Sequence, residues 1–187
     1  MEMQIVNELV KSRESFMYVN VDNHLFKRVR NSEYVDKSEL IELTNKVIDT
    51  EDQYICVTRP RRFGKSVTVK MLNAYYSKGC DSKALFSDLK IASSPDFESH
   101  LNQHDVIYLD MTEFADNKDN GNKYLENLNT NVVSELKDTY RDFFDKDKSY
   151  SLPEAIRCLK KRFIFIIDEW DFVFREYPNN LQLHKKF

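Results

Sequence analysis

The chain has 187 residues, of which 41% are hydrophobic and 32% are charged, a balance that is typical of a globular protein and excludes a disordered one. This length predicts one domain with a substantial core. The formal net charge of -3 excludes a protein that binds nucleic acid through its overall charge, although a local basic patch is compatible with it.

The three cysteines are odd in number and lack Cys-x-x-Cys spacing, and the four histidines show no metal-ligand spacing with them. This pattern indicates neither a disulfide framework nor a zinc site. The N-terminus starts no signal peptide, and the longest clear apolar run, Phe163–Ile167, is far too short to span a membrane. We therefore expect a cytoplasmic protein with no membrane partner.

In the first part of the chain, residues 1–17 carry apolar side chains at helical spacing and predict a short helix that packs on the domain. Tyr18–Val21 and Asn23–Phe26 are expected to be extended. A helix is predicted over Glu39–Ile48, and a short strand over Tyr54–Thr58.

After the basic turn that follows this strand, helices are predicted over Val67–Tyr76, Ser94–Leu101, Tyr124–Phe144 and Ser151–Lys161. Two further strands, Val106–Met111 and Phe163–Ile167, are almost continuously apolar, which is typical of strands buried on both faces. Residues 172–187 can form one more helix. Because strands alternate with helices, we predict an α/β fold in which a parallel sheet is flanked by helices on both faces.

The stretch Gln53–Val67 has the layout of a phosphate-binding loop: an apolar run, a basic turn, and Gly64-Lys65-Ser66 at the start of a helix. The standard pattern would place a glycine where this sequence has Arg59. Lys65 would contact the β- and γ-phosphates of ATP, and the Ser66 hydroxyl would bind Mg²⁺. The other candidate residues of the nucleotide site are Arg61, Arg62, Phe63 and Val67.

Carboxylates follow the most apolar predicted strand directly. Asp168 would hold Mg²⁺ through water, and Glu169 would polarise the attacking water as the catalytic residue. The carboxyl ends of parallel strands share one edge of a sheet, so Asp168 and the phosphate-binding loop are expected to meet there. Asp110 also ends a strand; it could approach this site, but capping of Thr112 is the favoured interpretation.

A second interpretation is an interaction or nucleic-acid-binding module whose basic turn contacts a phosphate backbone. It predicts an affinity that falls steeply with salt and no preference for a nucleotide. Arg59, Arg61 and Arg62 could contact phosphate in either case, or they could pair with acidic neighbours. The net charge and the carboxylates of Asp168 and Glu169 disfavour nucleic acid. A third interpretation is an inactive, truncated remnant.

Several motifs resemble those of the AAA-ATPase-like family, which is common in anaerobic gut bacteria. In chain order they are Tyr34-Val35-Asp36-Lys37-Ser38, Thr58-Arg59-Pro60-Arg61-Arg62-Phe63-Gly64-Lys65-Ser66, Leu85-Phe86 with Leu89-Lys90-Ile91, Val106–Asp110, and Ile166–Asp171. The loop Arg-Pro-Arg-Arg-Phe-Gly-Lys-Ser is highly specific because it replaces the glycine-first pattern in this family, which makes Arg59 a family variant. The resemblance extends from about residue 18 to the C-terminus and implies a P-loop NTPase fold that binds ATP.

The resemblance also carries expectations about completeness. Family members often carry a C-terminal PD-(D/E)xK nuclease-like domain, through which nucleic acid could be a partner, and nothing in this chain matches one. P-loop ATPases of this kind usually place a strand with a polar sensor residue between the P-loop strand and the Asp-Glu strand, and only residues 172–187 follow here. We therefore expect a C-terminally truncated chain whose full-length form hydrolyses ATP.

The resemblance also implies how the chain is organised into domains. Residues 1–33 are an N-terminal extension that packs on the domain, and residues 34–187 are the N-terminal portion of the AAA-ATPase-like P-loop domain. In such an incomplete sheet, the strands Tyr54–Thr58 and Phe163–Ile167 flank a gap. We expect unpaired backbone groups and exposed apolar side chains along that gap.

Overall fold

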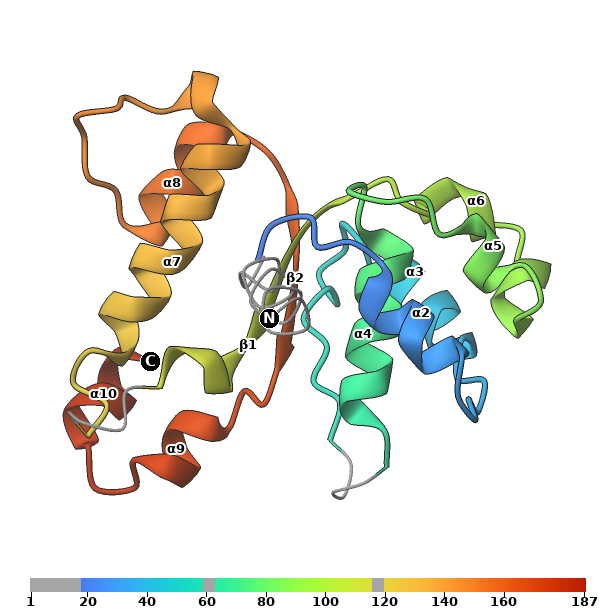
Figure 1. Ribbon diagram of the computed structural model, residues 1–187, viewed down its shortest axis with the longest axis horizontal. Coiled ribbons are helices and arrows are strands. Elements are labelled where there is room, and N and C mark those ends of the chain that lie inside the picture. Colours follow the sequence, from blue (N-terminus) through green and yellow to red (C-terminus); the bar gives the residue numbers. More distant parts are fainter. Residues whose placement is uncertain (1–17, 59–62, 116–119) are drawn as a thin grey trace, which may run out of the picture.

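The computed structural model describes residues 18–58, 63–115 and 120–187, and a small parallel sheet lies at its centre (Figure 1). Strand β1 (Asp105–Asp110) pairs with β2 (Phe163–Asp168), from Asp105 opposite Phe163 to Asp110 opposite Asp168. Because the two strands are parallel and in register, both end at the same edge of the sheet. The predicted mixed α/β class and the predicted parallel arrangement of strands are confirmed for these two strands.

Helices α2 to α6 lie on one side of this sheet (Figure 1). They are α2 (His24–Arg30), α3 (Glu39–Asn45), α4 (Lys65–Tyr76), α5 (Lys83–Phe86), the 3-10 helix η1 (Lys90–Ser93) and α6 (Phe97–His100). Their apolar side chains form one core with Val106 and Tyr108 of β1 and Ile166 of β2. This core buries aromatic rings from separate helices against each other.

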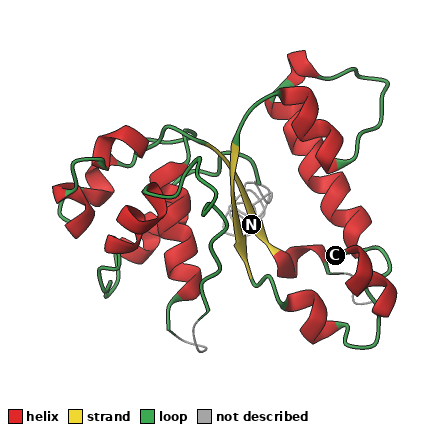
Figure 2. Ribbon diagram, turned by 180° about the vertical axis from the view of Figure 1, so that it is seen from behind, coloured by secondary structure: helices red, strands yellow, loops and turns green. Residues whose placement is uncertain are grey.

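The remaining helices lie on the other side, as the view from behind also shows (Figure 2). They are η2 (Met111–Phe114), α7 (Tyr124–Thr139), η3 (Arg141–Phe143), α8 (Leu152–Leu159), α9 (Phe172–Glu176) and α10 (Leu181–Lys186). Their core takes Ile107 and Leu109 from β1, so β1 is buried on both faces. Helix α8 starts with a capping box in which Glu154 Oε2 accepts a hydrogen bond from Ser151 N at 2.8 Å.

Strand β2 is buried on only one face. Ile164 and Ile166 belong to the core that contains α4, whereas Phe165 and Ile167 are 44% and 45% exposed. The register places these exposed residues beside Ile107 and Leu109, so they lie on the face of α7 and α8 without being covered. Residues near Val19 cover the outer edge of β1, but no described strand pairs with the outer edge of β2. The expected unpaired edge and exposed apolar side chains are therefore observed at β2.

The prediction of a strand over Tyr54–Thr58 is wrong. Residues 53–58 have no regular secondary structure, and the side chains of Tyr54, Ile55 and Val57 are 89%, 49% and 40% exposed. A β-strand is stable only when a neighbouring strand satisfies its N–H and C=O groups. The described part of the sheet contains only β1 and β2, and Tyr54–Thr58 does not pair with the free edge of β2, so this apolar segment stays outside the sheet.

Two further expectations need correction. Asn23–Phe26 was expected to be extended, but His24–Phe26 belong to α2, which buries Phe26 completely. Residues 172–187 form two short helices, α9 and α10, instead of one. The helix predicted within residues 1–17 lies outside the described residues. None of the described helices is both long enough and apolar enough to cross a membrane.

Candidate functional site

Helix α4 begins directly after Gly64, whose φ of 77° lies in the left-handed region that favours glycine. Thr68 N donates to Gly64 O at 3.0 Å, and the Thr68 hydroxyl donates to the same oxygen at 3.1 Å. A Cβ atom on Gly64 would lie 2.8 Å from Nζ of Lys37, so a side chain does not fit there without movement. The first N–H groups of a helix have no partner within it, and here they follow a tight glycine turn suited to an anion.

Lys65 and Ser66 are the first two residues of α4, and both side chains are partly exposed. Phe63 is 57% exposed, and Val67 lies partly buried one residue further along the helix. The predicted helix start at Gly64-Lys65-Ser66 is confirmed, and the helix begins at Lys65, two residues before the predicted Val67. Arg59, Arg61 and Arg62 lie outside the described residues, so their assignment to the nucleotide stays a prediction.

The second group of predicted site residues lies where β2 ends. Asp168 is the last residue of the strand and is only 6% exposed, with Oδ1 accepting a hydrogen bond from Glu169 N at 3.0 Å. Glu169 has a φ of 50°, a left-handed conformation that turns the chain sharply away from the sheet. At the end of β1, Asp110 Oδ1 accepts a hydrogen bond from Thr112 N at 2.9 Å, which confirms the predicted cap.

Arg175 of α9 holds the carboxylates that follow Asp168. Its Nη2 lies 2.7 Å from Oε2 of Glu169, and its Nη1 lies 2.9 Å from Oδ2 of Asp171. All three side chains are about one third to one half exposed, so these ion pairs contribute little to folding. Their geometric effect is larger, because one planar guanidinium fixes both carboxylates in place.

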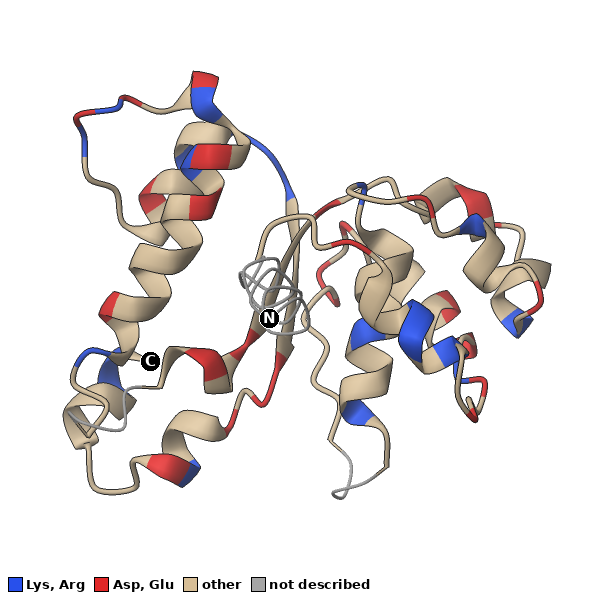
Figure 3. Cartoon of the chain, in the orientation of Figure 1, with Lys and Arg blue, Asp and Glu red and all other residues tan. Residues whose placement is uncertain are grey.

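The start of α4 and the ends of β1 and β2 lie toward the same end of the molecule (Figures 1 and 3). In Figure 3 the acidic residues that end both strands are drawn in red at this end, and a blue basic residue marks the first turn of α4. Helix α4 packs against both strands through the shared core. The fold therefore places the start of α4, which carries Lys65, and the end of β2, which carries Asp168, toward one end of the molecule, although the strand predicted before Lys65 is not formed.

Glu113 is a titratable residue at this end that sequence reasoning missed. It lies in η2, three residues after Asp110, and its side chain is partly buried. Burial raises the pKa of Glu113, and the nearby Asp110 carboxylate raises it further, to about 7. The spacing from a strand-ending aspartate was a signal in the sequence, but the burial that changes the pKa arises only in the fold.

Glu113→Gln is expected to make the fold more stable above neutral pH and to leave it unchanged in acid. The pKa of Glu113 is raised from 4.5 to about 7 in the folded chain, so the protonated form stabilises the fold and this contribution is lost as pH rises between those values. In thermal melts, the melting temperature of the variant should rise relative to that of the wild type as the pH increases across this range. Glu126→Gln, an exposed position on α7, is the control and should follow the wild type. If the melting temperatures of Glu113→Gln and the wild type changed with pH in parallel, the raised pKa of Glu113 would be contradicted.

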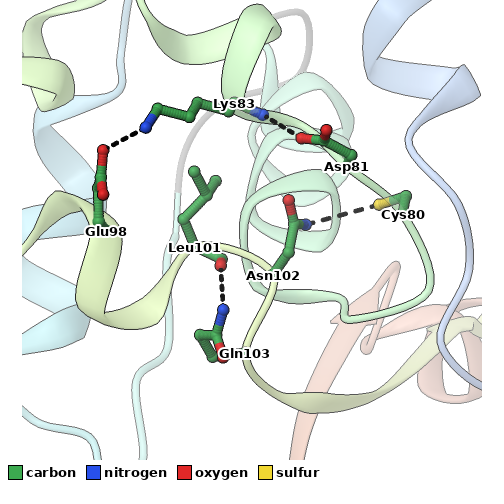
Figure 4. Close-up of a pocket in the computed structure, with 7 residues that line it drawn as sticks. All are labelled: Cys80, Asp81, Lys83, Glu98, Leu101, Asn102 and Gln103. Atoms are coloured by element: carbon green, nitrogen blue, oxygen red, sulfur yellow. Dashed lines mark hydrogen bonds and ion pairs between the residues drawn. The ribbon is translucent and has the colours of Figure 1, made fainter.

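A surface depression lies away from this end, beside α5 and α6 (Figure 4). It is lined by Cys80, Asp81, Lys83, Glu98, Leu101, Asn102 and Gln103. Its polar groups are already partnered: Lys83 Nζ pairs with Glu98 at 2.5 Å, and Gln103 Nε2 donates to Leu101 O at 3.1 Å. These bonds pair the Lys83 ammonium and the Gln103 amide nitrogen with groups of the protein itself.

The described chain is a mixed α/β protein that carries a glycine turn and Lys-Ser at a helix start, and a buried aspartate at a parallel strand end. Residues 20–187 match the family model AAA-ATPase_like, described as Predicted AAA-ATPase, and the chain belongs to this family. The predicted resemblance is thereby confirmed. The chain matches no curated protein and no solved structure.

Proposed function

We propose that this chain is a P-loop domain that binds ATP with Mg²⁺ at the start of α4 and hydrolyses it. The observation that carries the proposal is the left-handed Gly64 immediately before Lys65 and Ser66 at the first turn of a long helix. The N–H groups of that turn and the positive end of the helix dipole favour phosphate, and the ammonium of Lys65 adds a full charge. Membership of the Predicted AAA-ATPase family supports ATP as the nucleotide.

Two protein oxygens are candidates for holding Mg²⁺. The described residues contain no cluster of three His, Cys, Asp or Glu side chains that could hold a metal by itself. Mg²⁺ normally takes one or two protein oxygens and completes its shell with water and phosphate, so such a cluster is not required. We assign to it the Ser66 hydroxyl as a direct ligand and the buried Asp168 carboxylate as a group that would hold it through water. Bound there, Mg²⁺ would neutralise charge on the β- and γ-phosphates.

Glu169 supplies the general base in this proposal. It directly follows Asp168, and Arg175 holds its carboxylate in a fixed position. A positioned carboxylate at the phosphate end of the sheet can accept a proton from the attacking water. Asp168 itself is buried and hydrogen-bonded to Glu169 N, which suits a rigid metal ligand more than a base that exchanges protons with solvent.

Calorimetry with ATP and Mg²⁺ tests the proposal. The wild type should bind, and Lys65→Ala should weaken binding at least tenfold, because a charge-assisted hydrogen bond to phosphate contributes roughly 1.5–3 kcal/mol. Lys70→Ala removes a lysine from the same helix more than one turn away and should retain wild-type affinity. Equal affinity of wild type and Lys65→Ala would contradict the proposal. Salt-sensitive binding of DNA or RNA without binding of nucleotide would favour the phosphate-backbone function instead.

A further inference from the structure

The segment Tyr34–Ser38, here called the elbow, connects α2 to α3 and is fixed from several directions. Asp36 Oδ1 accepts a hydrogen bond from Ser38 N at 2.8 Å, and Asp36 Oδ2 accepts one from Lys90 N at 2.9 Å. Burial opposes ionisation of Asp36, but these two backbone hydrogen bonds outweigh it and lower the pKa of the carboxyl. Ser38 is fully buried, and its hydroxyl accepts a hydrogen bond from Ile91 N at 3.1 Å.

The elbow is also tied to the helix that follows the phosphate-binding loop. The hydroxyl of Tyr34 donates to Sδ of Met71 on α4 at 3.2 Å. The Tyr34 ring stands edge-on to the fully buried ring of Phe26, with centroids 5.4 Å apart. These contacts set the distance between the elbow and α4, because Met71 and Phe26 are both completely buried.

Lys37 extends from this fixed elbow to the start of α4. Its Nζ donates to Phe63 O at 2.8 Å, and the same atom would lie 2.8 Å from a Cβ built on Gly64. Three other lysines of this half of the chain pair with carboxylates: Lys78 with Asp105, Lys83 with Glu98 and Lys90 with Glu39. The partner of Lys37 is a neutral carbonyl, so that bond leaves its charge uncompensated. An ammonium has three donors, and this bond uses one of them.

We propose that Lys37 is a second phosphate-binding lysine of this site: it holds the Phe63–Gly64 peptide in place and directs its remaining charge to the terminal phosphates of the nucleotide. The inference rests on the proposed ATP-binding function. In this arrangement Asp36 anchors the elbow, and Lys37 contacts the ligand. Together with Lys65, it places two positive charges at one helix start, which suits a triphosphate better than a monophosphate.

Calorimetry of Lys37→Met with ATP, ADP and AMP tests this role, because methionine keeps the length of the side chain and removes its charge. ATP affinity should fall about tenfold, ADP affinity less, and AMP affinity by no more than about twofold. Lys90→Met is the matched control: it removes a lysine from the neighbouring η1 that pairs with Glu39 and does not contact the loop. Lys90→Met should bind all three nucleotides as the wild type does.

The outcomes separate this inference from the proposed function. If the wild type binds ATP, Lys65→Ala loses it and Lys37→Met keeps it, the role of Lys37 is refuted while ATP binding stands. If Lys37→Met lowered the affinities for ATP and AMP equally, Lys37 would only position the loop, and the inference would also be overturned. If the wild type binds no nucleotide, the proposed function and the inference fail together. Thermal melts of both methionine variants should match the wild type, which shows that the fold is intact.

Discussion

Glu169→Gln is expected to reduce ATP hydrolysis at least about a hundredfold while changing ATP affinity by no more than about twofold. The reason is geometric: Glu169 directly follows the buried Asp168, and its carboxylate is held by Arg175 rather than being free to turn away. Glutamine keeps the shape of the side chain but cannot accept a proton. Release of inorganic phosphate at saturating ATP measures the rate, and calorimetry measures the affinity.

Asp171→Asn is the matched control for this prediction. Asp171 shares Arg175 with Glu169, at 2.9 Å and 2.7 Å respectively, so either substitution removes one negative charge from the same ion-pair group. Only Glu169 follows the metal-ligand candidate directly. Asp171→Asn should therefore retain hydrolysis within a few-fold of the wild type. Equal losses in the two variants would show that the charge of the whole group matters and that Glu169 is not the base.

The buried strands were predictable because their signal is local. Continuous apolar runs before Asp110 and Asp168 predict strands, and parallel pairing then places both aspartates at one edge. Burial on both faces holds for β1 only, because Phe165 and Ile167 of β2 are exposed. The same reasoning failed at Tyr54–Thr58, where an apolar run is exposed because no described strand pairs with it. A strand depends on a neighbour that may lie far away in the sequence, whereas an amphipathic helix such as α7 carries most of its own pattern.

In the candidate site, too, local motifs were predictable and contacts between distant residues were not. Gly64, Lys65 and Ser66 form a contiguous motif, and the structure places them at a helix start as predicted. The role inferred for Lys37 depends on a contact with Phe63, 26 residues away, which no spacing rule predicts. The raised pKa of Glu113 arises from burial by the fold, which a single sequence does not show.

Phe86→Ala is expected to destabilise the chain by about 3–5 kcal/mol, a large share of the roughly 5–15 kcal/mol that stabilises a typical domain. Phe86 is fully buried; its ring stacks on Phe26 at 5.1 Å and meets the ring of Tyr75 on α4 at 5.5 Å. Removing it leaves a cavity between α2, α4 and α5. Urea denaturation should show a lower midpoint with an unchanged slope.

The effect should also reach the phosphate-binding loop, because Phe26 supports the ring of Tyr34 and thereby the elbow that contains Lys37. We expect Phe86→Ala to weaken ATP binding even at temperatures where the variant stays folded. Phe143→Ala makes the same chemical change at a side chain that is 51% exposed in η3, on the other side of the sheet. Phe143→Ala should lower the free energy of unfolding by less than about 1 kcal/mol, since truncating a half-exposed ring opens no closed cavity. Equal destabilisation by the two variants would mean that the aromatic core around Phe86 does not hold this half of the domain together.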